Sequence, residues 1–302
     1  MHRYKDLILE SGICFEVFDQ MLDEILFFDV DLLLTYLNPA AERSEGYTLE
    51  EAYGRSLFEL YDFHDDVRKD TSPAYIALTE KRRVRDMICT YCTNGLKKTK
   101  SISSTPIFKN GRLAGVFNIQ HDYTHISNMI DENLQLQSRI GQQSADPSER
   151  QDPFGHIIGA SAPFVHCLSL AKKAASTDSP VLLTGEGGCG KDTFARAIHR
   201  GSPRAAMPFL SINCASIPAD LSDGLLFGIE NTHYLGPDSE GLLAQVDKGT
   251  LYIEQITYMP AAVQVRLLRA LEQRSYVGPD GRVVPLDLRI ICSSDKPVTE
   301  II

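Results

Sequence analysis

Apolar and polar residues alternate in two different ways along the chain, and the change divides it into two halves. In the first half, short apolar runs such as EILFFDV and LLLTYL are joined by polar turns, and the dipeptides Asn94-Gly95 and Asn110-Gly111 separate three later runs. Asn-Gly between apolar runs is a strong hairpin signal. Two strands, short helices and a three-stranded meander predict an antiparallel sheet with helices on one face, an α+β domain.

The second half alternates longer helical segments with compact apolar runs. Strands are predicted at PVLLTG, FLSIN, GTLYIEQI and LDLRIICSS, with helices at residues 191–200 and at PAAVQVRLLRALEQ. The runs are nearly continuously apolar, as in strands covered on both sides. This order predicts an α/β domain, with a parallel sheet and helices on both faces.

A polar stretch, QSRIGQQSADPSERQDP, runs from Gln137 to Pro153 and is predicted to be a linker. The predicted organisation is therefore a first domain at residues 1–125, a connecting helix and linker at 126–155, and a second domain at 156–302. In the connecting helix, Ile126, Ile130 and Leu134 share one face. That face indicates either a helix that pairs with its twin in a dimer or a helix that caps its own sheet.

Composition and charge limit the partners and the cellular location expected for the protein. The chain has 302 residues, 43% of them hydrophobic, and a net charge of -10, which opposes broad contact with nucleic acid or an anionic membrane. The apolar segment ILFFDVDLLLTYL contains Asp29 and Asp31 and is too short to span a bilayer. No secretory signal opens the chain, and seven scattered cysteines favour a reduced, cytoplasmic protein with no membrane partner.

The first half resembles a PAS sensor domain. The resemblance rests on LNPAAERSEGYTLEEAYGRSLFEL at 37–60, TPIFKNGRLAGVFNIQHDYT at 105–124 and the ending Asp122-Tyr123-Thr124. It covers roughly residues 15–125 and implies a five-stranded sheet, a small-molecule ligand of unknown identity, and dimerisation.

A phosphate-binding loop is predicted where the second domain begins. Residues 185–191 fit G-x-x-x-x-G-K between a predicted strand and a predicted helix, which is the context that the motif needs. Its backbone N–H groups would cradle phosphate, and its lysine would pair with the β and γ phosphates of ATP. The predicted nucleotide-binding residues here are Gly185, Glu186, Gly187, Gly188, Cys189, Gly190, Lys191 and Asp192.

Residues 156–296 closely resemble the AAA+ domain of sigma-54-dependent transcription activators. The segments that carry the resemblance are AKKAASTDSPVLLTGEGGCGKDTFARAIHRGSPRAAMPFLSINCASIPADLSDGLLFG and GTLYIEQITYMPAAVQVRLLRALEQRSYVGPDGRVVPLDLRIICSSD. With a PAS domain ahead of it, the chain is similar to the arginine-catabolism regulators of that family. The resemblance implies an ATP-driven ring that acts on sigma-54 RNA polymerase. In this family an acidic residue normally follows the lysine of the phosphate loop, so the resemblance accounts for Asp192.

The resemblance assigns further residues one by one. Asn213 matches the asparagine that relays nucleotide state, and Ser294 matches a polar sensor position. The family's Asp-Glu pair, which organises magnesium and polarises the attacking water, is replaced by Glu254 and Gln255. Glu254 would hold Mg²⁺ with altered geometry, whereas Gln255 cannot accept a proton. Asp295 would bring a second negative charge toward the phosphates.

Other family parts are altered. The sigma-contacting loop falls at residues 232–237, where THYLGP replaces GAFTGA, and Ala244 stands at a usually acidic position. The sequence ends after the fourth predicted core strand, so the arginine fingers, helical lid and DNA-reading helices of the family are not expected in it. Without a fifth strand, PVLLTG is expected to be an exposed sheet edge.

Smaller features favour structural roles. Cys89 and Cys92 lie three apart in a predicted strand and point to opposite faces, so they do not form a zinc pair. Cys189 is expected to fill a tight turn rather than act as an oxidisable thiol. His64 is expected to be a polar side chain rather than a haem ligand. A basic face on the helix at 191–200, comprising Arg196, His199 and Arg200, is expected to be solvated.

These observations predict an ATP-binding, PAS-containing transcription regulator with a partial AAA+ domain, deficient in hydrolysis and lacking its own DNA-binding part. ATP and Mg²⁺ are the expected cofactors, and the chain is expected to form homo-oligomers or hetero-oligomers with relatives. Two alternatives remain. One is a fragment of an active ATP-hydrolysing activator, and the other is an interaction module that inhibits full-length relatives.

Overall fold

The computed structural model describes residues 15–61, 72–93, 95–143, 152–228 and 241–297. The described residues up to Ser127 form one compact unit, and those from Asn128 onward form a second. Among them, no helix has the length and apolar character needed to cross a membrane.

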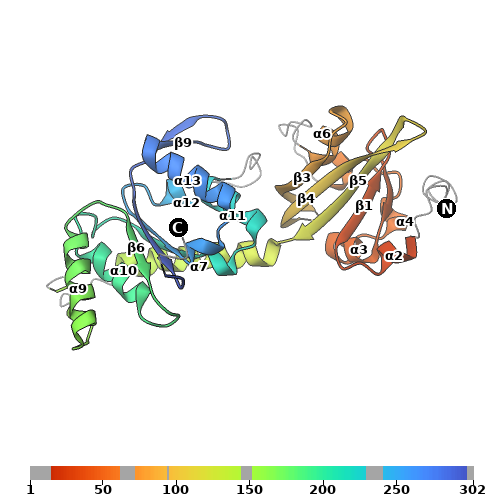
Figure 1. Ribbon diagram of the computed structural model, residues 1–302. Helices are drawn as coiled ribbons and strands as arrows, with labels where there is room; N and C mark the ends of the chain where they lie inside the picture. The colour runs from red at the N-terminus through yellow and green to blue at the C-terminus, as the bar shows by residue number, and fades with distance from the viewer. Residues whose placement is uncertain (1–14, 62–71, 94, 144–151, 229–240, 298–302) are drawn as a thin grey trace. The chain divides into compact units, whose positions relative to one another are not determined.

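The first unit is built on a five-stranded antiparallel sheet, as predicted (Figure 1). Its strands are β1 (Glu24–Phe28), β2 (Leu34–Leu37), β3 (Val84–Thr93), β4 (Leu96–Lys109) and β5 (Arg112–Asp122), in the order β2-β1-β5-β4-β3. The β4–β5 turn uses Asn110 and Gly111 at φ 51° and 77°, which suits a tight hairpin turn. The hairpin signal at this position is confirmed.

Short helices cover the sheet. They are α2 (Phe15–Asp19), α3 (Pro39–Glu45), α4 (Leu49–Ala52), α5 (Leu57–Leu60) and α6 (Pro73–Thr79). Leu26 and Phe28 face the main core with α3 to α6. The other face differs from the prediction of helices on one side only, because Ile25 and Phe27 pack there against Phe15 and Phe18 of α2.

An ion-paired cluster lies inside this unit. Lys100 is fully buried, and its ammonium contacts Glu24 Oε2 at 2.5 Å, Glu45 Oε1 at 2.7 Å and Ser44 Oγ at 3.0 Å. The Tyr91 hydroxyl donates to the same oxygen of Glu45 at 2.8 Å. The pairing joins β1, α3 and β4, so it ties the sheet to a covering helix.

The second unit is built on a four-stranded parallel sheet, as predicted. Its strands are β6 (Val181–Thr184), β7 (Phe209–Asn213), β8 (Thr250–Glu254) and β11 (Arg289–Ser294), in the order β6-β11-β8-β7. Within the described residues β6 therefore pairs only with β11, and Leu182 on it is 44% exposed. The expected position of β6 at a sheet edge is confirmed.

Helices cover both faces of this sheet (Figure 1). Tyr252 and Ile291 face a core with α9 (Ala162–Ala175) and α10 (Lys191–Arg200), whereas Leu251 and Ile253 face the opposite core. The elements of that second core are α11 (Ala219–Phe227), α12 (Leu242–Gln245), α13 (Ala261–Gln273) and an unpredicted hairpin of β9 (Ser275–Val277) and β10 (Val283–Pro285).

The connecting helix, α7, runs from Thr124 to Gln143. The prediction that a linker begins at Gln137 is therefore wrong, because glutamine and arginine are good helix formers and polarity alone does not end a helix. Leu134 is 5% exposed, and it packs with Ile130 in the core of the second unit. Two residues of the predicted apolar face, Ile130 and Leu134, thus pack in the core of the second unit.

Candidate functional site

The loop between β6 and α10 has the backbone that a phosphate cradle requires. Gly188 and Gly190 have φ of 76° and 89°, a left-handed conformation that favours glycine. A Cβ at either position would meet no atom within 4 Å, so conformation rather than crowding selects glycine there. The Gly185 N–H donates to the Ser294 carbonyl at 3.2 Å, which fixes the loop to the end of β11.

Lys191 is the first residue of α10, and its ammonium turns back into the loop. Its Nζ donates to the Gly185 carbonyl at 2.6 Å and to the Glu186 carbonyl at 2.8 Å, and it lies 3.9 Å from Cys189 Sγ. The positive charge is thus held over the loop at the N-terminus of a ten-residue helix, where anions are favoured.

Asp192, in the first turn of α10, pairs with Arg196 one turn later. Arg196 Nε lies 3.0 Å from Asp192 Oδ2, and its guanidinium carbon lies 5.0 Å from the centre of the Phe209 ring. Arg196 is therefore not the freely solvated residue predicted. Both side chains remain about half exposed, so the carboxylate can exchange partners at low cost.

Asn213 and Glu254 end adjacent strands in register. Parallel strands place such residues at the same carboxyl edge, where α/β sheets bind ligands. The Asn213 Oδ1 accepts from the Ala215 N–H at 2.9 Å, which orients that side chain and starts the short 3-10 turn Cys214–Ser216. Burial raises the pKa of Tyr252, and the nearby carboxylates of Glu254 and Asp192 raise it further.

Gln255 and Ser294 complete the carboxyl edge. Gln255 is left-handed at φ 55°, and its Oε1 accepts from the Asp295 N–H at 3.2 Å. Ser294 pairs in register with Thr184, and its Oγ accepts from the Lys296 N–H at 3.0 Å. The side-chain amide of Gln255 thus joins β8 to β11.

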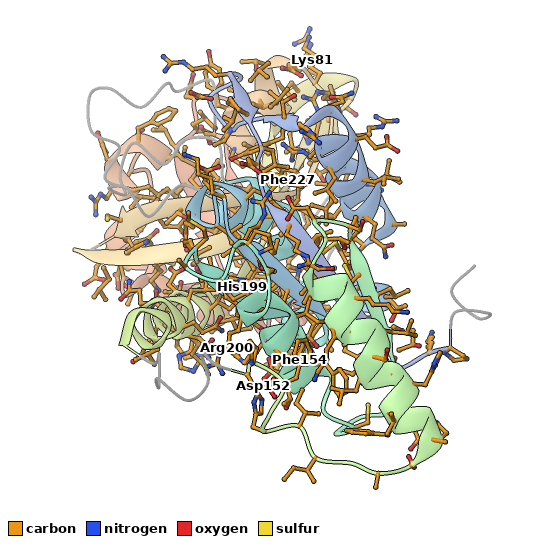
Figure 2. The ribbon with its side chains drawn as sticks, turned by 90° about the vertical axis from the view of Figure 1, so that its left-hand side faces the viewer. Lys81, Asp152, Phe154, His199, Arg200 and Phe227 are labelled. Atoms are coloured by element: carbon orange, nitrogen blue, oxygen red, sulfur yellow. The ribbon has the colours of Figure 1, made fainter. Side chains whose placement is uncertain are left out.

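The basic face predicted on α10 is wrong for His199. Figure 2 labels His199 and Arg200 on this helix, and His199 is only 5% exposed. Its Nδ1 lies 2.9 Å from Thr250 Oγ1 on β8. Burial lowers the pKa of His199 to about 4, and the charges of Arg200 and Arg289 act in the same direction. The histidine is therefore a neutral core residue.

The remaining predicted residues are Cys89, Cys92, Ala244, His64 and the sigma-contacting loop. Cys89 and Cys92 lie in β3, and the described cysteines are free thiols. No group of three or more His, Cys, Asp or Glu within the described ranges is arranged to hold a metal ion. Ala244 lies in α12. His64 and the loop at 232–237 lie outside the described residues.

Sequence reasoning missed two contacts near this edge. It assigned no role to the contact of Arg196 with Asp192, although the i,i+4 spacing is a detectable signal. It also placed Gln137 in a linker, whereas its side-chain amide bonds to Ser211 of β7. No local pattern signals a contact across 74 residues.

The fold and this loop together define a class, a PAS domain followed by a P-loop domain of AAA+ type. The model of the PAS fold matches residues 18–126, and that of the sigma-54 interaction domain matches residues 157–302. The chain thus carries a PAS domain followed by a sigma-54 interaction domain.

Among its relatives is the transcriptional activator RocR of Bacillus subtilis, 30% identical over 96% of this chain and 62% of RocR. The HTH-type transcriptional regulatory protein TyrR of Salmonella typhimurium is 36% identical over 54% of this chain and 31% of TyrR. The chain thus spans less than two thirds of these relatives.

Solved structures similar to this chain include NtrX from Brucella abortus in complex with ADP. It is 30% identical with a TM-score of 0.44, and the match covers 51% of this chain and 34% of that one. The PAS domain of nitrogen regulation protein NR(II) from Vibrio parahaemolyticus is 21% identical with a TM-score of 0.30, covering 35% of this chain and 94% of that one.

Proposed function

We propose that this chain is a PAS-containing transcription regulator that binds ATP with Mg²⁺ at residues 185–192 and hydrolyses it slowly. The observation that carries the proposal is the amide of Gln255, which follows β8 at the carboxyl edge of the sheet. The phosphate loop of the same domain keeps the left-handed glycines that the motif requires. A site of this kind can hold a triphosphate and lacks the group that would activate water.

Binding is supported by the chain's own groups. Lys191 already holds its ammonium over the loop by bonds to two loop carbonyls, which a phosphate would replace as its partners. The N–H groups at the start of α10 favour the same anion. Asn213 and Ser294, at the ends of their strands, are proposed to contact the nucleotide from the same edge.

The residues also fit a magnesium ion. Mg²⁺ is usually bound through one or two carboxylates together with substrate phosphates and water, rather than by a protein cage. Asp192, in the first turn of α10, and Glu254, the last residue of β8, are the carboxylates proposed to contact it. When bound, the ion would neutralise phosphate charge, and release of Asp192 from Arg196 would free one of its ligands.

Slow hydrolysis follows from Gln255. An amide cannot take a proton from water, and loss of general-base assistance typically lowers a rate by about 10²–10⁴-fold. The Gln255 oxygen is also bonded to the Asp295 N–H, which holds the side chain in place. The chain would therefore spend most of its time in a nucleotide-bound state.

The proposed partner is sigma-54 RNA polymerase, in agreement with the family model of the second domain. The replacement of the GAFTGA loop at residues 232–237 is proposed to weaken that contact. We further propose assembly into homo-oligomers, or hetero-oligomers with relatives, through the nucleotide-binding domain. The PAS domain would regulate this state through an unidentified ligand.

A titration of the purified chain with ATP and magnesium, read by calorimetry, tests the proposal. Lys191→Ala should abolish binding, since it removes the only side-chain ammonium bonded to the described loop. Lys173→Ala, at an exposed position of α9 in the same unit, is the matched control and should bind as the wild type does. Equal affinity in both variants would reject the site.

A further inference from the structure

The outer side of β7 is bonded by a side chain of α7. β7 is the last strand of the parallel sheet, and the described residues include no strand beyond it. Gln137 Nε2 donates to the Ser211 carbonyl at 3.1 Å, and Gln137 Oε1 accepts from the Ser211 N–H at 2.8 Å. One planar amide thus satisfies both backbone groups of the middle residue of the strand, as a neighbouring strand would.

The amide is held in that orientation from within α7. Gln137 Nε2 also donates to Asn133 Oδ1, one turn earlier, at 2.6 Å. On the same helix Leu134 is buried in the core of the second unit, and Ile130 packs against that core. Apolar contacts therefore seat the helix, and the two hydrogen bonds set its register along β7.

The contact lies two residues from the proposed nucleotide site. Ser211 precedes Asn213 on the same short strand, and Asn213 pairs in register with Glu254 of β8. The Asn213 side chain in turn accepts from the Ala215 N–H. A shift of β7 along its length would move this side chain relative to Glu254, because the strand is extended and has no flexible residue between the two positions.

We propose that Gln137 is a positioning residue of the nucleotide site. Docked on Ser211, it holds β7 in the register that pairs Asn213 with Glu254. When α7 moves away from the strand, the end of β7 and the Asn213 side chain lose this support. Since α7 begins at Thr124, directly after the last strand of the PAS-like sheet, one helix is continuous in the chain with that domain and hydrogen-bonded to this strand. Its effect on nucleotide affinity rests on the function proposed above, whereas its effect on Asn213 does not.

The test compares Gln137→Leu with Gln135→Leu in the full chain. Both variants replace a glutamine of α7 by a leucine of similar volume, but the Gln135 side chain is exposed. Amide hydrogen exchange is measured at Ser211 and at Ala215, with β6 as an internal reference. Affinity for a fluorescent ATP analogue is measured in parallel. Gln137→Glu, which keeps the acceptor and loses the donor, serves as the second variant.

We expect Gln137→Leu to speed exchange at both Ser211 and Ala215 by about tenfold or more, without a change in β6, and to alter nucleotide affinity by about threefold or more. Gln137→Glu should be intermediate, and Gln135→Leu should match the wild type. Faster exchange at Ser211 alone, or no change at either amide, would overturn the inference. If the wild type binds no nucleotide, the proposed function fails, and exchange at Ala215 alone decides the inference.

Discussion

Replacing Lys100 by methionine tests whether the buried ion cluster of the first unit stabilises it. The substitution keeps a long apolar side chain and removes a fully buried ammonium that contacts Glu24 at 2.5 Å and Glu45 at 2.7 Å. Two nearly inaccessible carboxylates then lose their counter-ion. Breaking a buried pair from one side costs about 3–5 kcal/mol. With a slope of about 2 kcal/mol per molar urea, the unfolding midpoint of this unit should fall by about 1.5–2.5 M.

The pH dependence of this cost gives a second measurement. Burial raises the pKa of Glu24, although Lys100 opposes the rise, and removal of Lys100 should raise this pKa further. A carboxyl with a raised pKa binds its proton more tightly in the folded state. Its stability contribution is therefore present at low pH and is lost as pH rises through the folded pKa. The Lys100→Met cost should be smaller at pH 5 than at pH 7.

Urea unfolding followed by circular dichroism at both pH values measures this directly, because the chain has no tryptophan. Lys97→Met, at a partly exposed position of the same strand, is the control and should change the midpoint little. A cost below about 1 kcal/mol, as for a surface pair, or an equal cost at pH 5 and pH 7, would refute the reasoning.

Two further predictions concern the second unit. Because burial lowers the pKa of His199 to about 4, its contribution to stability is complete above pH 6.5 and is lost as pH falls toward 4. Between pH 7 and pH 5 the wild type should lose about 2 kcal/mol more free energy of unfolding than His199→Gln does. An equal shift of the urea midpoint with pH in both proteins would contradict this. Gly190→Ala imposes φ of 89° on a residue with a Cβ, so it should cost about 1–2 kcal/mol by urea unfolding and weaken ATP binding. Gly187→Ala, where φ is not positive and space is open, is its control, and equal costs for the two would argue against the loop geometry.

The strands and the phosphate loop were predictable because their signals are local. Apolar runs gave β6, β7, β8 and β11, and Asn110-Gly111 gave the β4–β5 turn. The spacing of Gly185 and Lys191 placed the loop between a strand and a helix, where the structure has it. Each of these features depends on residues within about ten positions of one another.

The features that escaped prediction depend on distant residues. Lys100 meets Glu24 across 76 positions, and Gln137 meets Ser211 across 74. His199 lies in the last turn of α10, where its charged neighbours indicated a solvated face, but it is buried and bonded to Thr250. In each case a polar side chain satisfies its hydrogen bonds inside the fold, so local polarity did not indicate exposure.

Phosphate release by the wild type and by Gln255→Glu, with Lys191→Ala as baseline, tests the central claim most directly. We expect wild-type turnover near the baseline despite ATP binding. Restoring the carboxylate should raise turnover by about 10²-fold or more, because a proton acceptor returns beside the phosphate loop. Brisk wild-type hydrolysis that disappears in Lys191→Ala, or no gain in Gln255→Glu, would contradict the account.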